Sequence, residues 1–103
     1  MPEEFHLFVE LSAHPGRGDE LQAELLELAE KSLSTPICHS FTVSRSATDP
    51  DTFYLFESFL SADVYPDHVN TDHAQFFLNS TVPRLVASRS AKQLRNVPAA
   101  QSH

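Results

Sequence analysis

The run "TFYLFESFL", residues 52–60, restricts the possible folds more than any other stretch of this 103-residue chain. Its β-branched and aromatic residues favour a strand, in which side chains alternate between two faces. One face carries Phe53, Leu55, Glu57 and Phe59, and the other carries Tyr54, Phe56, Ser58 and Leu60. Because both faces are largely apolar, we expect this strand to be covered on both sides.

Two further strands and a helix are predicted before this run. Residues 5–11 alternate, with one continuous apolar face formed by Phe5, Leu7, Val9 and Leu11. Residues 19–33 consist almost entirely of good helix formers, and their leucines recur at helical spacing. Pro36 lies beyond that helix and opens a second strand, which places Ile37, His39, Phe41 and Val43 on one face and Cys38, Ser40, Thr42 and Ser44 on the other.

The chain after Ser61 is predicted to be helical in two broken pieces. Pro66 is tolerated only near the start of a piece, and Thr71 is a good N-cap for the second piece. Pro83 is expected to interrupt the helix again. A last, weakly patterned strand is predicted over about residues 89–97, and residues 98–103 are expected to be mobile.

The order of these elements is β-α-β-β-α-β. It predicts an α+β fold: a ferredoxin-like βαββαβ subunit with a four-stranded antiparallel sheet and two helices on one face. We expect a single domain over residues 1–103, with a core of about residues 5–97. No element remains to cover the other face of the sheet, so the sequence predicts a homodimer through sheet-to-sheet packing, which closes a dimeric α/β barrel.

Composition excludes some partners. Seven basic and fourteen acidic residues give a net charge of −7, which disfavours nucleic acid and anionic membranes as partners. No stretch reaches the ~20 apolar residues of a membrane span. The single cysteine, Cys38, suits a reducing compartment, and the N-terminus carries acids where a secretory signal carries positive charge. We therefore predict a soluble, cytoplasmic protein.

The stretch "ESFLSADVYPDHVNTDHAQFF", residues 57–77, holds the candidates for chemistry. On one continuous helix, His68 and His73 would diverge by roughly 140°, whereas zinc-binding pairs use i,i+4 spacing. We therefore predict no metal site. Two glycines are too few for a glycine-rich phosphate cradle, and no cofactor is predicted. Cys38 has no flanking cation and is interpreted as an ordinary half-buried cysteine.

Glu57 is the only ionisable residue on its face of the predicted third strand. A carboxylate among aromatic side chains is costly unless it is paired. His39 would lie roughly opposite if the hairpin pairs around "SATDPD", although a register slip of one residue would reverse that result. His68 and His73 could also reach it from the second helical region. A bracing role for Glu57 and a catalytic role both stay open at this level.

Three segments of the chain resemble the antibiotic biosynthesis monooxygenase (ABM) family, whose members are small dimeric α+β barrels. They are "HPGRGDELQAELLELAEKS", the hairpin "PICHSFTVSRSATDPDTFYLFESF", and "HVNTDHAQFF", which is similar to the family's H-x4-H pattern after an E-x-aromatic strand end. The resemblance covers about residues 5–97. It implies one of several chemistries: cofactor-independent oxygenation of aromatic polyketides or quinols, haem degradation, or isomerisation of a phosphorylated sugar. Because the haem-degrading branch relies on a tryptophan and this chain has none, haem degradation is not expected.

Under the oxygenase interpretation, the substrate pocket lies between the sheet and the helices. The residues expected to bind the substrate are Phe41, Phe53, Phe56, Phe59, Phe76, Phe77 and His39. His68 or His73 would remove a phenolic proton, Glu57 would orient that histidine, and the resulting anion would react with dioxygen. Two alternatives stay open. One is an isomerase-like proton shuttle on a small phosphorylated hydroxyketone, and the other is a non-catalytic dimeric ligand-binding protein.

Overall fold

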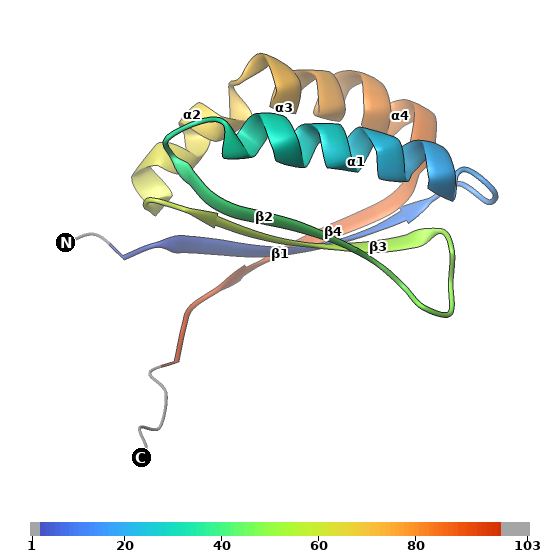
Figure 1. The fold of residues 1–103 in the computed structure, drawn as a ribbon, viewed down its shortest axis with the longest axis horizontal. Helices are drawn as coiled ribbons and strands as arrows, with labels where there is room; N and C mark the ends of the chain where they lie inside the picture. Colours follow the sequence, from blue (N-terminus) through green and yellow to red (C-terminus); the bar gives the residue numbers. More distant parts are fainter. Residues whose placement is uncertain (1–2, 98–103) are drawn as a thin grey trace.

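The computed structural model describes residues 3–97, which form one antiparallel sheet with all helices on the same face (Figure 1). The strands are β1 (Phe5–Ala13), β2 (Cys38–Arg45), β3 (Thr52–Phe59) and β4 (Val86–Leu94), and their order in the sheet is β2-β3-β1-β4. Helix α1 (Gly18–Leu33) follows β1. A second helical region joins β3 to β4 and consists of η1 (Ala62–Val64), α2 (Tyr65–Val69), α3 (Asp72–Phe76), η2 (Phe77–Thr81) and α4 (Val82–Leu85). The predicted ferredoxin-like βαββαβ fold is confirmed.

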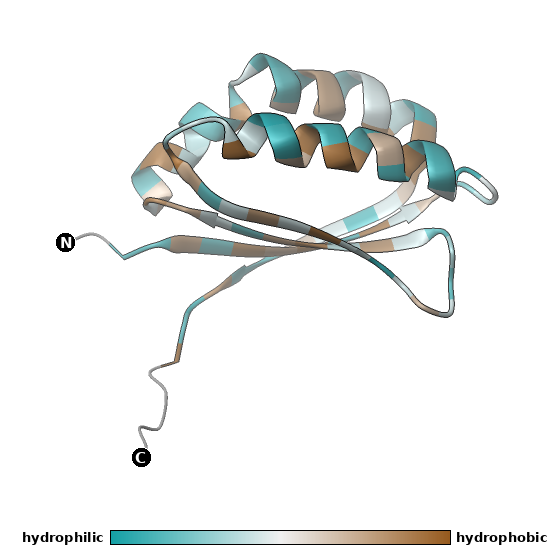
Figure 2. Ribbon diagram, in the orientation of Figure 1, coloured by the Kyte–Doolittle hydropathy of each residue, from teal (hydrophilic) through white to brown (hydrophobic). Residues whose placement is uncertain are grey.

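Helix α1 packs on the sheet through an apolar stripe. Leu21 and Leu25 are fully buried, and Figure 2 shows apolar and polar bands alternating along the helix. The β2–β3 turn caps its N-terminus, because the Asp51 carboxylate accepts hydrogen bonds from the backbone amides of Gly16 and Gly18, each at 3.1 Å. The bond from Gly18 satisfies an amide that the helix leaves free, and the carboxylate adds a negative charge at the positive end of the helix.

The second helical region begins as predicted and continues further than predicted. Pro66 lies in the first turn of α2, and the Thr71 hydroxyl caps α3 by accepting a hydrogen bond from the Ala74 amide at 3.3 Å. The expected interruption at Pro83 is wrong, since the chain stays helical from α3 to α4 (Figure 1). The segment η2 is a π-helix, in which the regular α-helical hydrogen-bond ladder is interrupted, and Pro83 follows it directly in α4.

The two faces of β3 have different surroundings. Its helix-covered face carries Phe53, Leu55, Glu57 and Phe59, all buried. On the other face, Phe56 packs against Phe8 with ring centroids 4.8 Å apart and is 49% exposed. The prediction that Phe56 lines a pocket between the sheet and the helices is therefore wrong, because strand alternation places its side chain on the side without helices.

A β-bulge in β2 changes the position of His39. Cys38 pairs with Phe59 and Ser40 pairs with Ser58, so His39 has no partner on β3. The residue opposite Glu57 is Phe41. The exposed His39 ring instead contacts the carboxylate of Glu4. The predicted His39–Glu57 pairing, and with it a substrate-binding role beside Glu57, is wrong because the extra residue reverses the alternation of the strand at this point.

The last strand starts three residues earlier than the predicted residue 89. Leu85 ends the helical region inside the core, and Val86 pairs at once with Ala13 of β1. The expectation for residues 98–103 lies outside the described residues. Within residues 3–97, no helix combines the length and the apolar character that crossing a bilayer requires.

Candidate active site

A cavity of about 90 Å³ lies between the sheet and the second helical region. Leu7, Val9 and Leu55 contribute from the sheet, and Phe41 and Phe77 add aromatic walls. Its polar side chains come from three different elements and are Glu57 of β3, Tyr65 and His68 of α2, and Arg89 of β4. We call this space the inner cavity. It combines apolar walls with a few polar groups, which is the usual composition of a small-molecule site.

Glu57 is 7% exposed, and its neighbours across the strands are Leu7 on β1 and Phe41 on β2. Within residues 3–97 its carboxyl group makes no hydrogen bond or ion pair, so the bracing role that the sequence left open has no contact to support it. Burial among apolar side chains raises the pKa of Glu57 to about 7. A carboxyl with this pKa can both accept and release a proton near neutral pH.

His68 is 6% exposed and packs against aromatic rings. Its ring centroid lies 4.6 Å from that of Phe59 and 5.8 Å from that of Tyr65. Burial, with a smaller contribution from His73, lowers the pKa of His68 to about 4. The imidazole is therefore neutral at pH 7, and its buried Nδ1 has no hydrogen-bond partner within the described residues.

Tyr65 and Arg89 line the inner cavity but were not among the site residues predicted from the sequence. Burial, and next the nearby Glu57, raises the pKa of the Tyr65 hydroxyl, while Arg89 acts in the opposite direction. Arg89 lies opposite the buried Leu11 in the sheet and therefore projects from the helix-covered face. The sequence held one signal for Arg89, its alternation with Ala91 and Gln93, but the strand has no apolar pattern by which its helix-covered face could be recognised.

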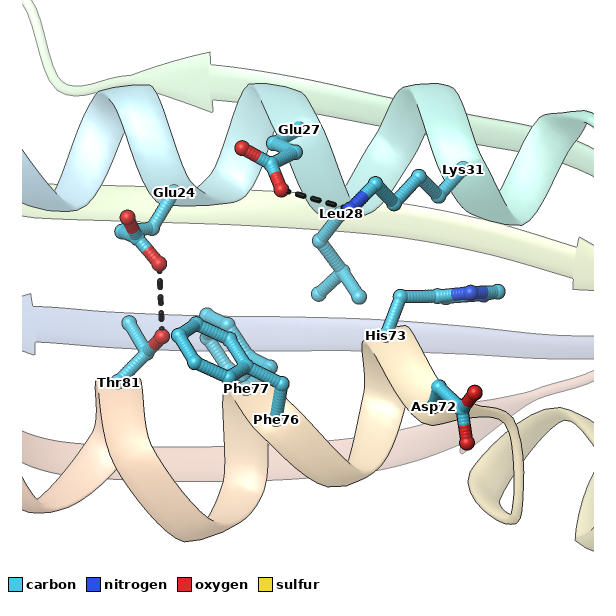
Figure 3. Close-up of a pocket in the computed structure, with 9 residues that line it drawn as sticks. All are labelled: Glu24, Glu27, Leu28, Lys31, Asp72, His73, Phe76, Phe77 and Thr81. Carbon is cyan, nitrogen blue, oxygen red and sulfur yellow. Dashed lines mark hydrogen bonds and ion pairs between the residues drawn. The ribbon is translucent and has the colours of Figure 1, made fainter.

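A second, larger hollow of about 380 Å³ separates α1 from the α3–η2 segment (Figure 3). Two polar contacts lie at its edges: the Thr81 hydroxyl donates to Glu24 at 2.9 Å, and Lys31 pairs with Glu27 at 2.8 Å. The remaining lining residues are Leu28, Asp72, His73, Phe76 and Phe77. We call this space the α1–α3 groove. It is rich in carboxylates, in contrast to the inner cavity.

His73 lines the groove, and its ring centroid is 6.2 Å from that of His68. The predicted divergence of the two histidines is wrong, because it assumed one continuous helix. Helix α2 ends at Val69 with Asn70 as its C-cap, and Thr71 adopts an extended backbone conformation, so the chain turns before α3 begins. Burial, followed by the nearby charge of Lys31, lowers the pKa of His73, and Asp72 opposes this effect.

The structure thus divides the predicted site residues into groups. Glu57, His68, Phe41 and Phe77 meet at the inner cavity, whereas His73 and Phe76 line the groove. Phe53 and Phe59 are fully buried in the core and line neither space; they lie towards the two ends of β3, on either side of Leu55 and Glu57, which do line the inner cavity. Cys38 is also buried, and burial raises the pKa of its thiol to about 11, which leaves it unreactive at neutral pH.

Within the described residues, no group of three or more His, Cys, Asp and Glu side chains is arranged to hold a metal ion. The groups that face the inner cavity can exchange protons, hold an anionic oxygen and surround an apolar molecule. Glu57 would exchange the proton, and Arg89 and Tyr65 can interact with the oxygen.

This fold and site define a ferredoxin-like α+β domain with a buried acid–base pocket, and comparison with known proteins identifies its family. Residues 5–79 match the model of the family described as antibiotic biosynthesis monooxygenase. The chain belongs to this family. No curated protein sequence gives a significant match.

Several solved structures share the fold. The Pseudomonas aeruginosa protein PA3566 superposes with a TM-score of 0.88 at 24% identity, with 94% of this chain and 97% of that chain covered. Rv0793 from Mycobacterium tuberculosis superposes with a TM-score of 0.83 at 17% identity, with 96% of this chain and 100% of that chain covered. A structure described as an antibiotic biosynthesis monooxygenase superposes with a TM-score of 0.82 at 18% identity, with 91% of this chain and 99% of that chain covered. At these identities the likeness establishes the fold.

Proposed function

We propose that the protein is a monooxygenase that acts on a small aromatic, quinol or polyketide-type substrate without a metal or organic cofactor. The observation that carries this proposal is the inner cavity itself, in which an apolar space holds a carboxyl group with a pKa of about 7. Membership of the antibiotic biosynthesis monooxygenase family supports the same reaction class.

In the proposed reaction, a group facing the inner cavity removes a proton from the substrate. Glu57 is the best placed to do so near neutral pH, and the neutral His68 positions the substrate by a hydrogen bond. The electron-rich anion then supplies the electrons for dioxygen. One oxygen atom enters the substrate as a carbonyl, the other leaves as water, and two substrate hydrogens are lost with it. Apolar walls exclude bulk water from the anion.

The size of the inner cavity limits what it can hold. A cavity of roughly 150 Å³ accommodates benzene, so about 90 Å³ is enough only for the reacting edge of a ring. Arg89 and Ala91 of β4 line the cavity and are exposed to solvent. We expect the rest of the substrate to extend past these residues, with its phenolic oxygen near Arg89.

Oxygen consumption tests the proposed function. The wild-type protein is expected to consume dioxygen with at least one member of a panel of naphthoquinols and anthrones, in a one-to-one ratio to product. The double variant His68→Ala, His73→Ala should lose this activity. The proposal is overturned if no quinol is consumed faster than in buffer, or if the double variant turns over as fast as wild type.

One observation favours a second candidate, the isomerase-like proton shuttle. That reaction needs a cation for the phosphate group, and Arg89 supplies one at the inner cavity. The acid–base groups would be the same, but no dioxygen would be consumed. Conversion of a phosphorylated hydroxyketone under anaerobic conditions would therefore select this candidate over the oxygenase.

We also propose that a second copy of the chain covers the open face of the sheet. Phe8, Tyr54 and Phe56 form an aromatic cluster there, with ring centroids 4.8 to 5.9 Å apart, on the side without helices (Figure 1). An apolar cluster of this kind on a sheet face is typical of an interface. The protein should sediment as a dimer, and Phe56→Lys should sediment as a monomer. A cytoplasmic location stays a prediction.

A further inference from the structure

The inner cavity and the α1–α3 groove share a wall. Leu28 of α1 and Phe77 of η2 line both the inner cavity and the groove. Their apolar side chains separate the small buried cavity from the larger, charged groove that Figure 3 shows between the helices. Such a wall keeps bulk water away from the reacting groups, but it also closes the short route by which a proton could leave the cavity.

The two histidines lie on opposite sides of this wall. His68 lines the inner cavity and not the groove, whereas His73 lines the groove and not the cavity. Their ring centroids are 6.2 Å apart, and the rings meet edge to face. This is the only place in the described chain where an ionisable side chain of one space lies in ring contact with one of the other.

One nitrogen of each ring is buried without a hydrogen-bond partner. These atoms are Nδ1 of His68 and Nε2 of His73, and within the described residues the only other such side-chain atom is Ser32 Oγ. Buried polar atoms are nearly always satisfied by protein or by an ordered water. Two unsatisfied nitrogens on neighbouring rings, with no direct hydrogen bond between them, are the arrangement that a single bridging water completes.

We propose that His68, one bridging water and His73 form a proton relay through the wall between the inner cavity and the α1–α3 groove. The inference rests on the proposed function for its purpose, because it gives the substrate proton an exit, but not for its geometry. His73 is then a relay residue that does not touch the substrate. This separates the roles of two histidines that the sequence treated as interchangeable bases.

The relay needs no lasting charge inside the wall. Glu57 gives the substrate proton to Nε2 of His68 across the inner cavity, and His68 releases the proton of its Nδ1 to the water. The water passes a proton to Nε2 of His73, and His73 releases the proton of its other ring nitrogen to the groove. Each ring ends neutral with its proton on the opposite nitrogen. Formation of water from dioxygen takes up a proton later in the proposed reaction, and passage of that proton in the reverse direction restores both rings.

The ionisable groups around the two rings fit proton transfer from the inner cavity to the groove. His68 faces Glu57 of β3, Tyr65 of its own helix and Arg89 of β4 across the inner cavity. His73 faces Lys31 of α1 and its neighbour Asp72, while Glu24 and Glu27 of α1 line the same groove. The carboxylate of Asp72, next to His73 in the groove, can accept the proton that His73 releases and pass it to solvent.

Exchange of the His68 ring N–H with water tests the relay in the resting protein. We would measure it by nitrogen-15 NMR at pH 7, without substrate, for wild type, His73→Phe, His73→Gln and the control His14→Phe, which alters an exposed turn residue. We expect exchange to slow by about tenfold or more in both His73 variants and to stay at the wild-type rate in the control. Glutamine keeps a donor and an acceptor but cannot move a proton from one end of its side chain to the other.

The outcomes separate the relay from packing and from the proposed function. If the His68 ring N–H of the His73→Gln variant exchanges at the wild-type rate, the relay is overturned, because hydrogen bonding alone would then suffice. If His73→Phe does not fold, the His73→Gln variant alone decides. In the oxygenase assay, His73→Gln should lower turnover, and added imidazole should restore it. If no quinol is oxidised, the proposed function fails while the exchange rates still decide the relay.

Discussion

Both the inner cavity and the α1–α3 groove contain glutamate and histidine side chains, but only the glutamate of the cavity is buried among apolar side chains. The groove has a volume of about 380 Å³ and the inner cavity about 90 Å³. Carboxylates in the groove lie near solvent or contact polar partners, as in the Glu27–Lys31 pair. In the cavity, burial raises the pKa of Glu57 to about 7 and lowers that of His68 to about 4.

This difference teaches that desolvation, and not the size of the hollow, marks the candidate reactive site. Burial disfavours the charged form of either group, so it moves the pKa of an acid up and that of a base down, towards neutral forms at pH 7. The larger groove offers more room, but its glutamates are not buried among apolar side chains. Substitutions in each space can break or sharpen this contrast.

The largest expected effect is on turnover. Glu57→Gln keeps the size and polarity of the side chain but removes the proton acceptor, so oxygen consumption with the best quinol should fall by about 100-fold or more. The matched variant Glu27→Gln, in the groove, should keep the wild-type rate within about twofold. Equal losses in the two variants would remove the distinction between the two spaces.

The next largest effect is expected on stability, from a substitution in the wall that Leu28 and Phe77 form between the two spaces. Phe77 is 7% exposed and separates the two spaces, so Phe77→Ala should reduce the free energy of unfolding by about 3–5 kcal/mol and join them. Its neighbour Phe76 is 55% exposed, and Phe76→Ala should cost about 1 kcal/mol or less. Urea unfolding of both variants measures the difference. Similar losses would show that Phe77 does not form a packed wall.

The pKa of Glu57 predicts a pH-dependent stability. Because its pKa is raised from 4.5 to about 7, ionisation costs folding free energy that is absent below pH 4.5 and complete above pH 7. At pH 8, Glu57→Gln should therefore be more stable than wild type by about 3 kcal/mol, since each pKa unit is worth about 1.4 kcal/mol. At pH 4 the two proteins should be equally stable. A gain that does not change with pH would contradict the assignment.

The smallest expected effect concerns the groove. Thr81 is fully buried, and its hydroxyl donates to Glu24 at 2.9 Å. Thr81→Val keeps the shape and removes this hydrogen bond, which should cost about 1 kcal/mol in urea unfolding. Turnover should be unchanged, because the inner cavity keeps all its lining residues. A large loss of turnover would connect the groove to chemistry beyond the relay.

Much of the fold could be predicted from local patterns. The alternation in residues 5–11 and 52–60 and the leucine spacing in residues 19–33 identified three elements, and Thr71 was recognised as a cap. The face shared by Phe53, Leu55, Glu57 and Phe59 was also correct. These features depend on neighbours close in the sequence, whose side-chain directions follow from strand or helix geometry.

The errors arose where one residue changes the geometry. The bulge at His39 reversed the predicted pairing with Glu57, and the break at Asn70 and Thr71 brought together two histidines that a continuous helix would separate. Arg89 was not recognised, because the strand that carries it has no apolar pattern. In each case the deciding contacts are with segments distant in the sequence, so the local pattern cannot specify them.

The sequence by itself determined the order of the elements, the apolar face that buries Glu57, and the two histidines that follow it. Only the tertiary structure decided that Glu57 and His68 share one cavity while His73 lies in another space beyond Leu28 and Phe77. The physical reason is that side-chain periodicity is a local property of the backbone, whereas desolvation depends on which distant segments exclude water from a group.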